Sequence, residues 1–331
     1  MKNNSIDFVV PWVDSNDPSW REDLIKHKKL AGLYSDATDK RYRDWGLFKY
    51  WFRGVEQFAP WVRKIHVVTA GHYPNWLNLN HPKINFVKHS DYMPKKYLPT
   101  FSVNPIELNL HRIDSLSEHF VYFNDDIFLK APVDPSLFFN NGLPCDSAVM
   151  TTFSGTGFTR MVINSNIIIN SYKNKRSVIK ENPFNFFNPR YGIDQIRSLL
   201  LLPWKEFTGF HDYHLANAYL KSTFEEVWKL EYQPLDEASA RKFRHSLDLN
   251  QAVFRYWQIV NNKFSPISKQ KIGDYYRVGI DPFDKVIESL NSNKKPLICL
   301  NDHDPEDLDH IIETIQESFE KRFPNKSSFE L

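Results

Sequence analysis

Acidic and amide side chains follow three separate apolar segments, each of which is predicted to be a buried strand. Asp14 follows residues 6–13, a pair of acids at Asp125 and Asp126 follows residues 119–123, and Asn301 and Asp302 follow residues 296–300. Ligands of open α/β sheets bind beyond the carboxyl ends of the strands, so these side chains converge if the strands are parallel neighbours. Asp and Asn are also ordinary turn residues after a strand. Three such strand ends, with two adjacent acids that repel each other, favour a functional cluster.

Clustered oxygen ligands suit Mg²⁺ or Mn²⁺, and these ions in turn suit diphosphates. The spacing of the acids therefore supports a metal-dependent enzyme that acts on a phosphate-bearing substrate.

Two basic segments could supply proton transfer and phosphate binding. His211, in the segment 211–214, could act as a general base, although a lone histidine is more often a cap or core residue. Arg244 lies in the segment 241–245, whose cations could clamp a diphosphate because guanidinium binds phosphate oxygens in pairs. A charge run of this kind is equally compatible with a solvated surface. Arg112, next to His111 on a predicted helix, is ambiguous in the same way.

Composition excludes several other classes of protein. The 42 basic and 40 acidic residues nearly balance, with no concentrated basic run, which argues against nucleic-acid binding. Neither GxGxxG nor GxxxxGK[ST] occurs, so no glycine-rich phosphate loop is indicated. Cys145 and Cys299 lack CxxC spacing, which argues against a disulfide framework or zinc site. The longest apolar run, Leu199 to Pro203, is interpreted as the end of a buried helix, and no signal-peptide core is seen, so we expect a cytoplasmic protein.

Strand and helix patterns alternate in the first part of the chain, which indicates an α/β fold with a mostly parallel, Rossmann-like sheet. The predicted strands are residues 6–13, 64–70, 84–87 and 119–123. From about residue 160 to 265 helix follows helix, and residues 296–300 then return as a strand that completes the sheet. We predict a catalytic domain of residues 1–155 and 266–323, a helical insertion at 156–265, and a loosely ordered tail at 324–331.

Four segments resemble the conserved blocks of the Stealth family of sugar-phosphate transferases, which includes bacterial capsule and cell-surface polysaccharide phosphotransferases. They are IDFVVPWVDSNDP at 6–18, a long block from RYRDWGLFKYW to HFVYFNDDIFL at 41–129, FHDYHLANAY with FRHSLDLNQAVFRYW, and LICLNDHD at 297–304. The likeness spans nearly the whole chain. It also implies a fold similar to that of nucleotide-sugar transferases.

The resemblance implies that a sugar-1-phosphate moves from a nucleotide-diphosphosugar, expected to be UDP-linked, to a hydroxyl of a surface or capsular polysaccharide. A phosphodiester forms and a nucleoside monophosphate is released. By the same resemblance Asp126 is catalytic, His211 is the base and Arg244 stabilises the transferred phosphoryl group. Mg²⁺ or Mn²⁺ is expected on Asp125, Asp126 and Asp302. Tyr213 replaces a proline that many members carry two residues after the histidine, which leaves the choice between His211 and His214 open.

The remaining expectations concern substrates, partners and rival functions. The residues expected to bind substrate are Asp14, Asn16, Arg43, Arg112, His214, His245 and Asn301. The expected partners are a nucleotide-sugar donor and an oligosaccharide or lipid-linked glycan acceptor, and no nucleic acid. A lipid-linked acceptor would bring the protein to the inner membrane face. The alternatives are a metal-dependent glycosyltransferase, which would form a glycosidic bond, and a non-catalytic carbohydrate-binding module.

Overall fold

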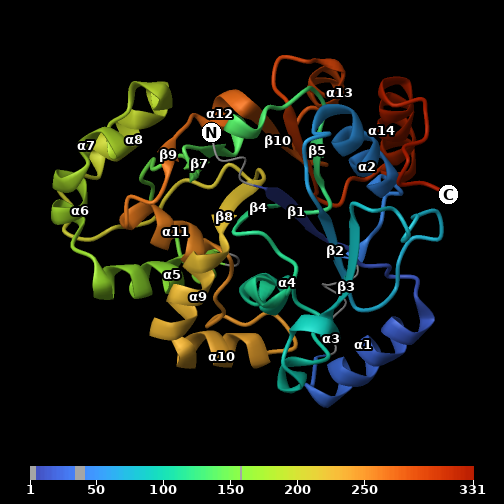
Figure 1. Ribbon diagram of the computed structural model, residues 1–331, viewed down its shortest axis with the longest axis horizontal. Coiled ribbons are helices and arrows are strands. Elements are labelled where there is room, and N and C mark those ends of the chain that lie inside the picture. The colour runs from blue at the N-terminus through green and yellow to red at the C-terminus, as the bar shows by residue number, and fades with distance from the viewer. Residues whose placement is uncertain (1–4, 34–41, 157–158) are drawn as a thin grey trace.

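A central sheet of five strands organises the protein, whose computed structural model describes residues 5–33, 42–156 and 159–331 (Figure 1). The strands are β1 (Ile6–Pro11), β2 (Ile65–Thr69), β3 (Ile84–Lys88), β4 (His119–Tyr122) and β8 (Asn217–Leu220), in the order β3-β2-β1-β4-β8. The first four are parallel, and β8 is antiparallel to β4. The order 3-2-1-4 is that of a Rossmann-like half, whose switch point lies between β1 and β4. The predicted fold class is therefore confirmed.

Both faces of this sheet are covered, which explains why β1 reads as a continuous apolar run. Successive side chains of a strand point to opposite faces. Phe8 accordingly belongs to a core cluster with side chains of α2 (Phe48–Phe58), α13 (Phe283–Asn291) and α14 (Leu308–Arg322). Val9 belongs to a second cluster, which includes side chains of α4 (Val103–Leu108), α9 (Lys221–Leu230), α10 (Tyr232–Ala240) and α11 (Ala252–Val260).

A second sheet takes up the last strand, contrary to our prediction that this strand completes the main sheet. β11 (Leu297–Asp302) pairs in parallel with β10 (Gly273–Val278) and antiparallel with β5 (Ile127–Leu129). The backbone N–H of Leu300 also donates to the carbonyl of Asp126 at 2.9 Å. Because β5 follows β4 after one short turn, that turn lies at the junction of the two sheets.

The segment expected to be a helical insertion also contributes to the main sheet. It holds α5 (Thr159–Tyr172), α6 (Lys175–Glu181), α7 (Pro183–Phe186) and α8 (Gln195–Leu200), which lie at one side of the molecule (Figure 1). It also holds β8, which extends the sheet next to β4. The prediction of a helical insertion at 156–265 did not include this strand, because four residues were not distinguished from the helices around them.

Three further α-helices and a small sheet lie outside the two larger sheets. The helices are α1 (Pro18–Leu30), α3 (His89–Tyr92) and α12 (Lys269–Ile272), and the sheet consists of β6 (Phe139–Asn140), β7 (Leu143–Asp146) and β9 (Ser265–Pro266). Across the described ranges, the structure contains no helix with the length and apolar character needed to cross a bilayer.

Residues 324–331 are packed against α2, whereas we expected a loosely ordered tail. Phe329 is 2% exposed and its ring lies 5.5 Å from that of Phe52. Arg53 donates to Glu330 through Nε at 2.8 Å and through a terminal nitrogen at 2.9 Å. The buried ring of Phe329 and the ion pair between Arg53 and Glu330 therefore hold this segment in place, although its polar composition had indicated a loosely ordered tail.

Candidate active site

The turn between β4 and β5 carries the adjacent acids and is fixed from the second sheet. Nδ2 of Asn301, in β11, donates to Oδ2 of Asp126 at 3.0 Å. Oδ1 of Asp126 is buried and has no hydrogen-bond partner among the described residues. Burial raises the pKa of Asp126, and the hydrogen bond from Asn301 opposes that rise. The structure therefore brings Asp126 and Asn301 together, as predicted from the two strand ends.

Asp125 lines a cavity of about 520 Å³ together with Asp44, an acid that the sequence reasoning did not select. The surrounding protein, the charge of Asp126 and the charge of Asp44 raise the pKa of Asp125 to about 7. Asp125 is nevertheless an exposed residue, so solvent screens part of this repulsion. In the sequence, Asp44 is followed two residues later by Gly46, a spacing typical of a turn. In the structure the backbone N–H of Gly46 donates to the Asp44 carboxylate at 2.8 Å.

Two arginines face these acids around the same cavity. Arg43 donates to Asp302 at 3.1 Å and to Asp304 at 3.1 Å. Trp45 Nε1 donates to the same Asp302 oxygen at 3.3 Å. Asp302 is thus engaged with Arg43, although it lines the cavity together with Asp125 and Asp126. Arg244 also lines this cavity.

The acid pair has the chemistry of a divalent-cation site that is completed by substrate. Within the described part of the chain, no three His, Cys, Asp or Glu side chains converge on a ready-made metal site. Mg²⁺ characteristically binds one or two carboxylates and takes further ligands from water and substrate phosphates. Asp125 and Asp126, with the unpartnered buried Oδ1 of the latter, fit such an ion. Asp302 fits it less well, because Arg43 and Trp45 already use one of its oxygens.

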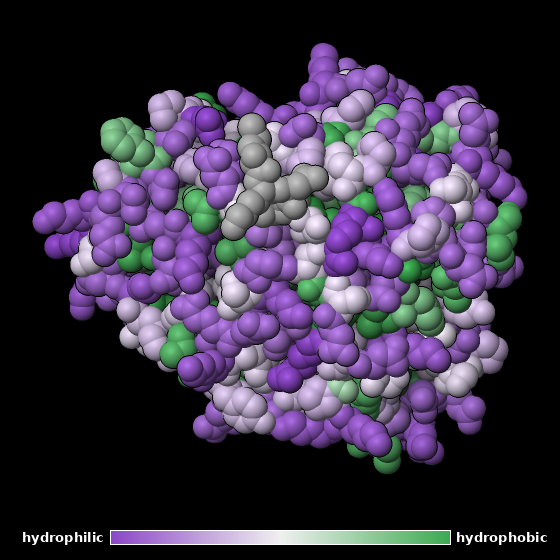
Figure 2. All heavy atoms as spheres, in the orientation of Figure 1, coloured by the Kyte–Doolittle hydropathy of each residue, from purple (hydrophilic) through white to green (hydrophobic). Residues whose placement is uncertain are grey.

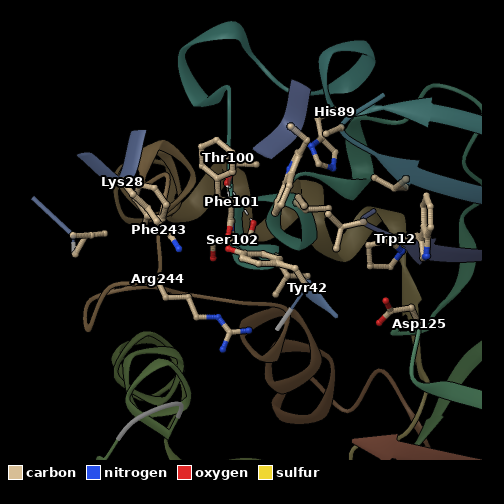
Figure 3. A pocket seen from close by; sticks show the side chains of 18 residues that line it. Trp12, Lys28, Tyr42, His89, Thr100, Phe101, Ser102, Asp125, Phe243 and Arg244 are labelled. Carbon is tan, nitrogen blue, oxygen red and sulfur yellow. Dashed lines mark hydrogen bonds between the residues drawn. The ribbon is translucent and has the colours of Figure 1, made fainter. Parts of the chain in front are cut away.

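A second cavity, of about 290 Å³, adjoins the first and has five aromatic side chains in its lining; we call it the aromatic pocket. Its aromatic lining consists of Trp12, Trp20, Tyr42, Phe101 and Phe243. Figure 3 shows several of these rings around the pocket, with Arg244 and Asp125 along one of its edges. Asp125 and Arg244 line both cavities, so an elongated ligand could occupy them together.

A third cavity, of about 120 Å³, contains His214 and again Arg244. The His214 backbone N–H donates to Asp212 at 2.9 Å, and Nδ1 lies 3.9 Å from the other Asp212 oxygen. The His214 ring stacks on Tyr275 at a centroid distance of 4.5 Å. The charge of His214 also lowers the pKa of Asp126, against the larger effect of burial. His214 therefore acts electrostatically on Asp126, one of the two acids.

His211 is oriented differently and lines none of these three cavities. Its ring meets Tyr213 edge-on at 4.4 Å, and Tyr213 Oη donates to Asp194 at 2.8 Å. Burial lowers the pKa of His211, and the charge of Arg197 lowers it further. Of the two histidines, His214 lines a cavity that contains Arg244 and affects the pKa of Asp126, whereas His211 does neither.

Four other predicted substrate contacts lie outside these cavities. Asp14 accepts the N–H of Asn16 at 2.8 Å, just beyond the cavity-lining residues Trp12 and Val13. Arg112 donates to Asn109 at 2.9 Å and lies over the ring of Trp228 at 4.7 Å. His245 is exposed, and its N–H donates to Asp248 at 2.8 Å. The structure does not bring Asp14, Asn16, Arg112 or His245 into contact with the acid pair.

Two further buried residues support the site and were missed by the sequence reasoning. Arg255 pairs with Asp146 at 2.7 Å and donates to the carbonyl of His211 at 3.1 Å, which fixes the histidine segment. Glu107 lines the third cavity, accepts from Tyr122 at 2.9 Å, and has its pKa raised to about 7 by burial. Both residues lie in segments predicted to be helical, and the sequence alone does not show that a charged residue of a helix is buried.

Comparison with known proteins identifies the family. The family model "Stealth protein CR2, conserved region 2" matches residues 41–145. A capsular polysaccharide phosphotransferase WcwK of Streptococcus pneumoniae is 42% identical, covering 100% of this chain and 99% of the relative. The exopolysaccharide phosphotransferase cps2G of Lactiplantibacillus plantarum is 40% identical, with 98% of this chain and 96% of the relative covered. The receptor polysaccharide phosphotransferase WefC of Streptococcus gordonii is 42% identical, with 98% and 99% covered.

Among solved structures, apo WbbM, a bifunctional glycosyltransferase, matches 97% of this chain and 52% of its own with a TM-score of 0.37 and 12% identity. That likeness is too weak to inform function. The sequence relatives, by contrast, are matched over almost their entire length at 40–42% identity. The chain belongs to the Stealth family, together with these polysaccharide phosphotransferases.

Proposed function

We propose that this protein transfers a sugar-1-phosphate from a UDP-sugar to a hydroxyl of a growing capsular or extracellular polysaccharide. One observation carries the proposal: the acids Asp125 and Asp126 share a cavity with Arg43 and Arg244, and that cavity adjoins an aromatic pocket. Carboxylates suit a divalent cation, guanidinium groups suit phosphate oxygens, and an aromatic pocket suits a planar base. The relatives named above as polysaccharide phosphotransferases support the same reaction type.

The reaction we propose breaks a phosphorus–oxygen bond. The acceptor hydroxyl oxygen attacks the phosphorus that carries the sugar, and the bond from that phosphorus to the bridging oxygen breaks. The nucleoside monophosphate leaves with the bridging oxygen, and the hydroxyl proton passes to a base on the enzyme. The product is a sugar joined to the polysaccharide through a phosphodiester.

Each site residue has a role in this reaction. A Mg²⁺ or Mn²⁺ ion held by Asp125 and Asp126 would neutralise charge on the diphosphate. Arg244 lines all three cavities and can therefore stabilise charge on the phosphoryl oxygens during transfer. Asn301 orients Asp126 through its hydrogen bond at 3.0 Å.

We propose His214 as the proton acceptor. It lines the cavity that also contains Arg244, and its ring stacks on Tyr275, with Nδ1 3.9 Å from the Asp212 carboxylate. His211, which the family resemblance suggested for this role, is the alternative. In that case the segment 211–214 would have to move when substrate binds, because His211 lines none of the three cavities.

We further propose that the acceptor is an oligosaccharide or lipid-linked glycan, and that the enzyme works in the cytoplasm at the inner membrane face. Nucleotide-sugars and lipid-linked intermediates would meet there. The proposal assigns the nucleoside to the aromatic pocket, rather than to Asp14 and Asn16 alone, because that pocket opens toward Asp125.

Product analysis tests the proposal. The enzyme is incubated with Mg²⁺, a panel of UDP-sugars and short acceptor oligosaccharides, and the products are examined by mass spectrometry and phosphorus NMR. We expect UMP together with an acceptor that has gained one sugar phosphate in a phosphodiester. Release of UDP with a phosphate-free product would instead show a glycosyltransferase. Saturable binding of acceptor without any donor turnover would show a carbohydrate-binding module.

A further inference from the structure

Large hydrophobic side chains are exposed on the outlying helices α7 and α8, on the 3₁₀ segment Pro189–Asp194 between them, and on the turn that follows α8. They are Phe184, Ile193, Ile196, Leu199, Leu200, Leu202 and Trp204, with Leu200 69% and Trp204 54% exposed. Figure 2 shows hydrophobic residues at the corner of the molecule where Figure 1 places these helices. A soluble monomer rarely exposes such a concentration of apolar side chains unless the surface binds something.

The apolar run Leu199–Pro203 was interpreted as the end of a buried helix, and the structure shows that this is wrong. α8 has six residues, of which only Ser198 is buried, and the turn after it buries only Leu201. Ser198 accepts the backbone N–H of Met150 at 2.9 Å, so a serine occupies the packed side of this helix. The leucines and isoleucine around it consequently face outward.

The turn that carries Leu202 and Trp204 is held in place by the buried side chain of Lys175. Nζ of Lys175, whose residue is 1% exposed, donates to the carbonyl of Leu201 at 2.5 Å and to that of Trp204 at 2.9 Å. A buried lysine that bonds two carbonyls of one turn fixes its backbone. The apolar side chains are thus presented outward by an ordered turn.

Positive charge is concentrated in the same segment. Residues 173–206 contain seven Lys and Arg against three Asp and Glu, a net charge of +4, whereas the whole chain has a net charge of +2. The rest of the protein is therefore net negative by two charges. The exposed cations of this segment are Arg176, Lys180, Arg190, Arg197 and Lys205.

We propose that residues 173–206 form a docking surface for a membrane rich in anionic lipids. Leucine, isoleucine, phenylalanine and tryptophan side chains enter the headgroup boundary, while neighbouring lysines and arginines attract anionic headgroups. Two copies of this chain would bring like charges together, so charge complementarity favours a lipid surface over a symmetric dimer. This inference rests on the proposed function only in one respect, because that function explains why the protein would bind a membrane. The residues of the surface themselves lie outside the three cavities.

Docking at this surface would also place the catalytic segment near lipid-linked acceptors. Asp194, immediately before α8, accepts a hydrogen bond from Tyr213 Oη at 2.8 Å. Tyr213 lies between His211 and His214, so the docking surface and the histidine segment are directly connected.

Vesicle co-sedimentation of the full chain tests the inference. Wild-type protein is mixed with vesicles of phosphatidylcholine alone and with vesicles that also contain phosphatidylglycerol. We expect at least tenfold stronger partitioning to the anionic vesicles, weakened by salt. Ile196→Glu should lower this partitioning at least tenfold. Ile280→Glu, a matched change at a residue that is 57% exposed against 53% for Ile196, should change it less than twofold.

A second pair of variants tests the charges. Arg176→Glu with Lys180→Glu should reduce partitioning to anionic vesicles at least tenfold. Lys285→Glu with Lys321→Glu makes the same change in net charge on α13 and α14 and should not reduce it.

Turnover of a water-soluble donor and acceptor should stay within twofold for Ile196→Glu. Loss of that turnover, with the melting temperature unchanged, would overturn the assignment. Equal partitioning of Ile196→Glu and Ile280→Glu would overturn it too, as would a wild-type dimer that Ile196→Glu converts to a monomer.

Discussion

Asn301 donates a hydrogen bond to Asp126 at 3.0 Å across 175 residues of sequence, and this bond joins the ends of β11 and β4. It occupies Oδ2 of Asp126 and leaves the buried Oδ1 without a partner. The orientation of the carboxylate is therefore set by a strand from a different sheet. The catalytic proposal depends on this orientation.

Asp126→Asn tests the role of the acid pair. We expect turnover to fall more than about a hundredfold, because an amide is a far weaker cation ligand and removes one of two adjacent charges. The melting temperature should change little, since the side chain keeps its size. Excess EDTA should abolish wild-type turnover, and added Mg²⁺ or Mn²⁺ should restore it. Full activity in EDTA would refute the metal-dependent mechanism.

The two histidines are compared by His211→Ala and His214→Ala at saturating donor. From the geometry, His214→Ala should reduce turnover by about 10²–10⁴-fold, the usual contribution of a general base, with donor binding nearly intact. His211→Ala should cost much less. If His211→Ala is instead the inactive variant, the resemblance identifies the base and our structural assignment is wrong. If neither variant loses more than about threefold, a carboxylate such as Asp126 takes the proton.

Arg244→Ala tests stabilisation of the transferred phosphoryl group. We expect kcat to fall by about 10²–10³-fold, as when a donor to a developing charge is removed, with a smaller change in KM for the donor. The adjacent His245→Ala is the matched control, because His245 lines none of the three cavities, and it should stay within about twofold. A rise in KM alone would show that Arg244 only binds the donor.

The pH dependence of stability tests the environment of Glu107. Burial raises its pKa to about 7 in the folded protein, above its unfolded value. Between the unfolded and folded pKa values, Glu107 keeps its proton in the folded state and has lost it in the unfolded state. Its contribution to the free energy of unfolding is therefore fully present at low pH and is lost as the pH rises through about 7. We expect the free energy of unfolding to fall by about 3 kcal/mol between pH 5 and 8 as this contribution is lost. Urea unfolding should show a weaker dependence on pH for Glu107→Gln, whatever its absolute stability.

Glu330→Gln tests the packed tail. Arg53 and Glu330 are both largely buried, and removing one partner of such a pair leaves an uncompensated charge. We expect a loss of about 3 kcal/mol in the free energy of unfolding, measured in urea, since Glu320 remains as a partial partner. Glu317→Gln on the exposed side of α14 should change stability by less than about 0.5 kcal/mol. Equal stability of the two variants would show that the tail contributes nothing.

Much of the fold could be predicted because its parallel strands are buried on both faces. Such strands appear in the sequence as continuous apolar runs, and β1, β2, β3 and β4 lie within one or two residues of their predicted bounds. The β8 strand was missed, because four residues between helices carry no distinctive period. The placement of β11 in a second sheet was missed as well, because pairing partners depend on tertiary contacts that no local pattern encodes.

The site was predictable where a residue follows a strand and less so elsewhere. Asp125 and Asp126 follow β4, Asn301 lies near the end of β11, and the structure brings the three together. Arg112 and His245 were chosen for charge alone, and the structure shows their side chains engaged or exposed away from the cavities. Which histidine faces the acids depends on the conformation of a four-residue segment, where His214 has a φ of 49°. Composition does not determine that conformation.

The acids Asp125 and Asp126 and the strand β11 line the same cavity but lie far apart in the sequence, which has a consequence for the synthesis of the protein. A ribosome that has translated β5 has already made both acids, Asp125 and Asp126. It has not yet made β11, which pairs with β5 and supplies Asn301. A nascent chain thus carries both acids before the strand that orients Asp126 has been made, so the acid pair can reach its folded geometry only late in synthesis.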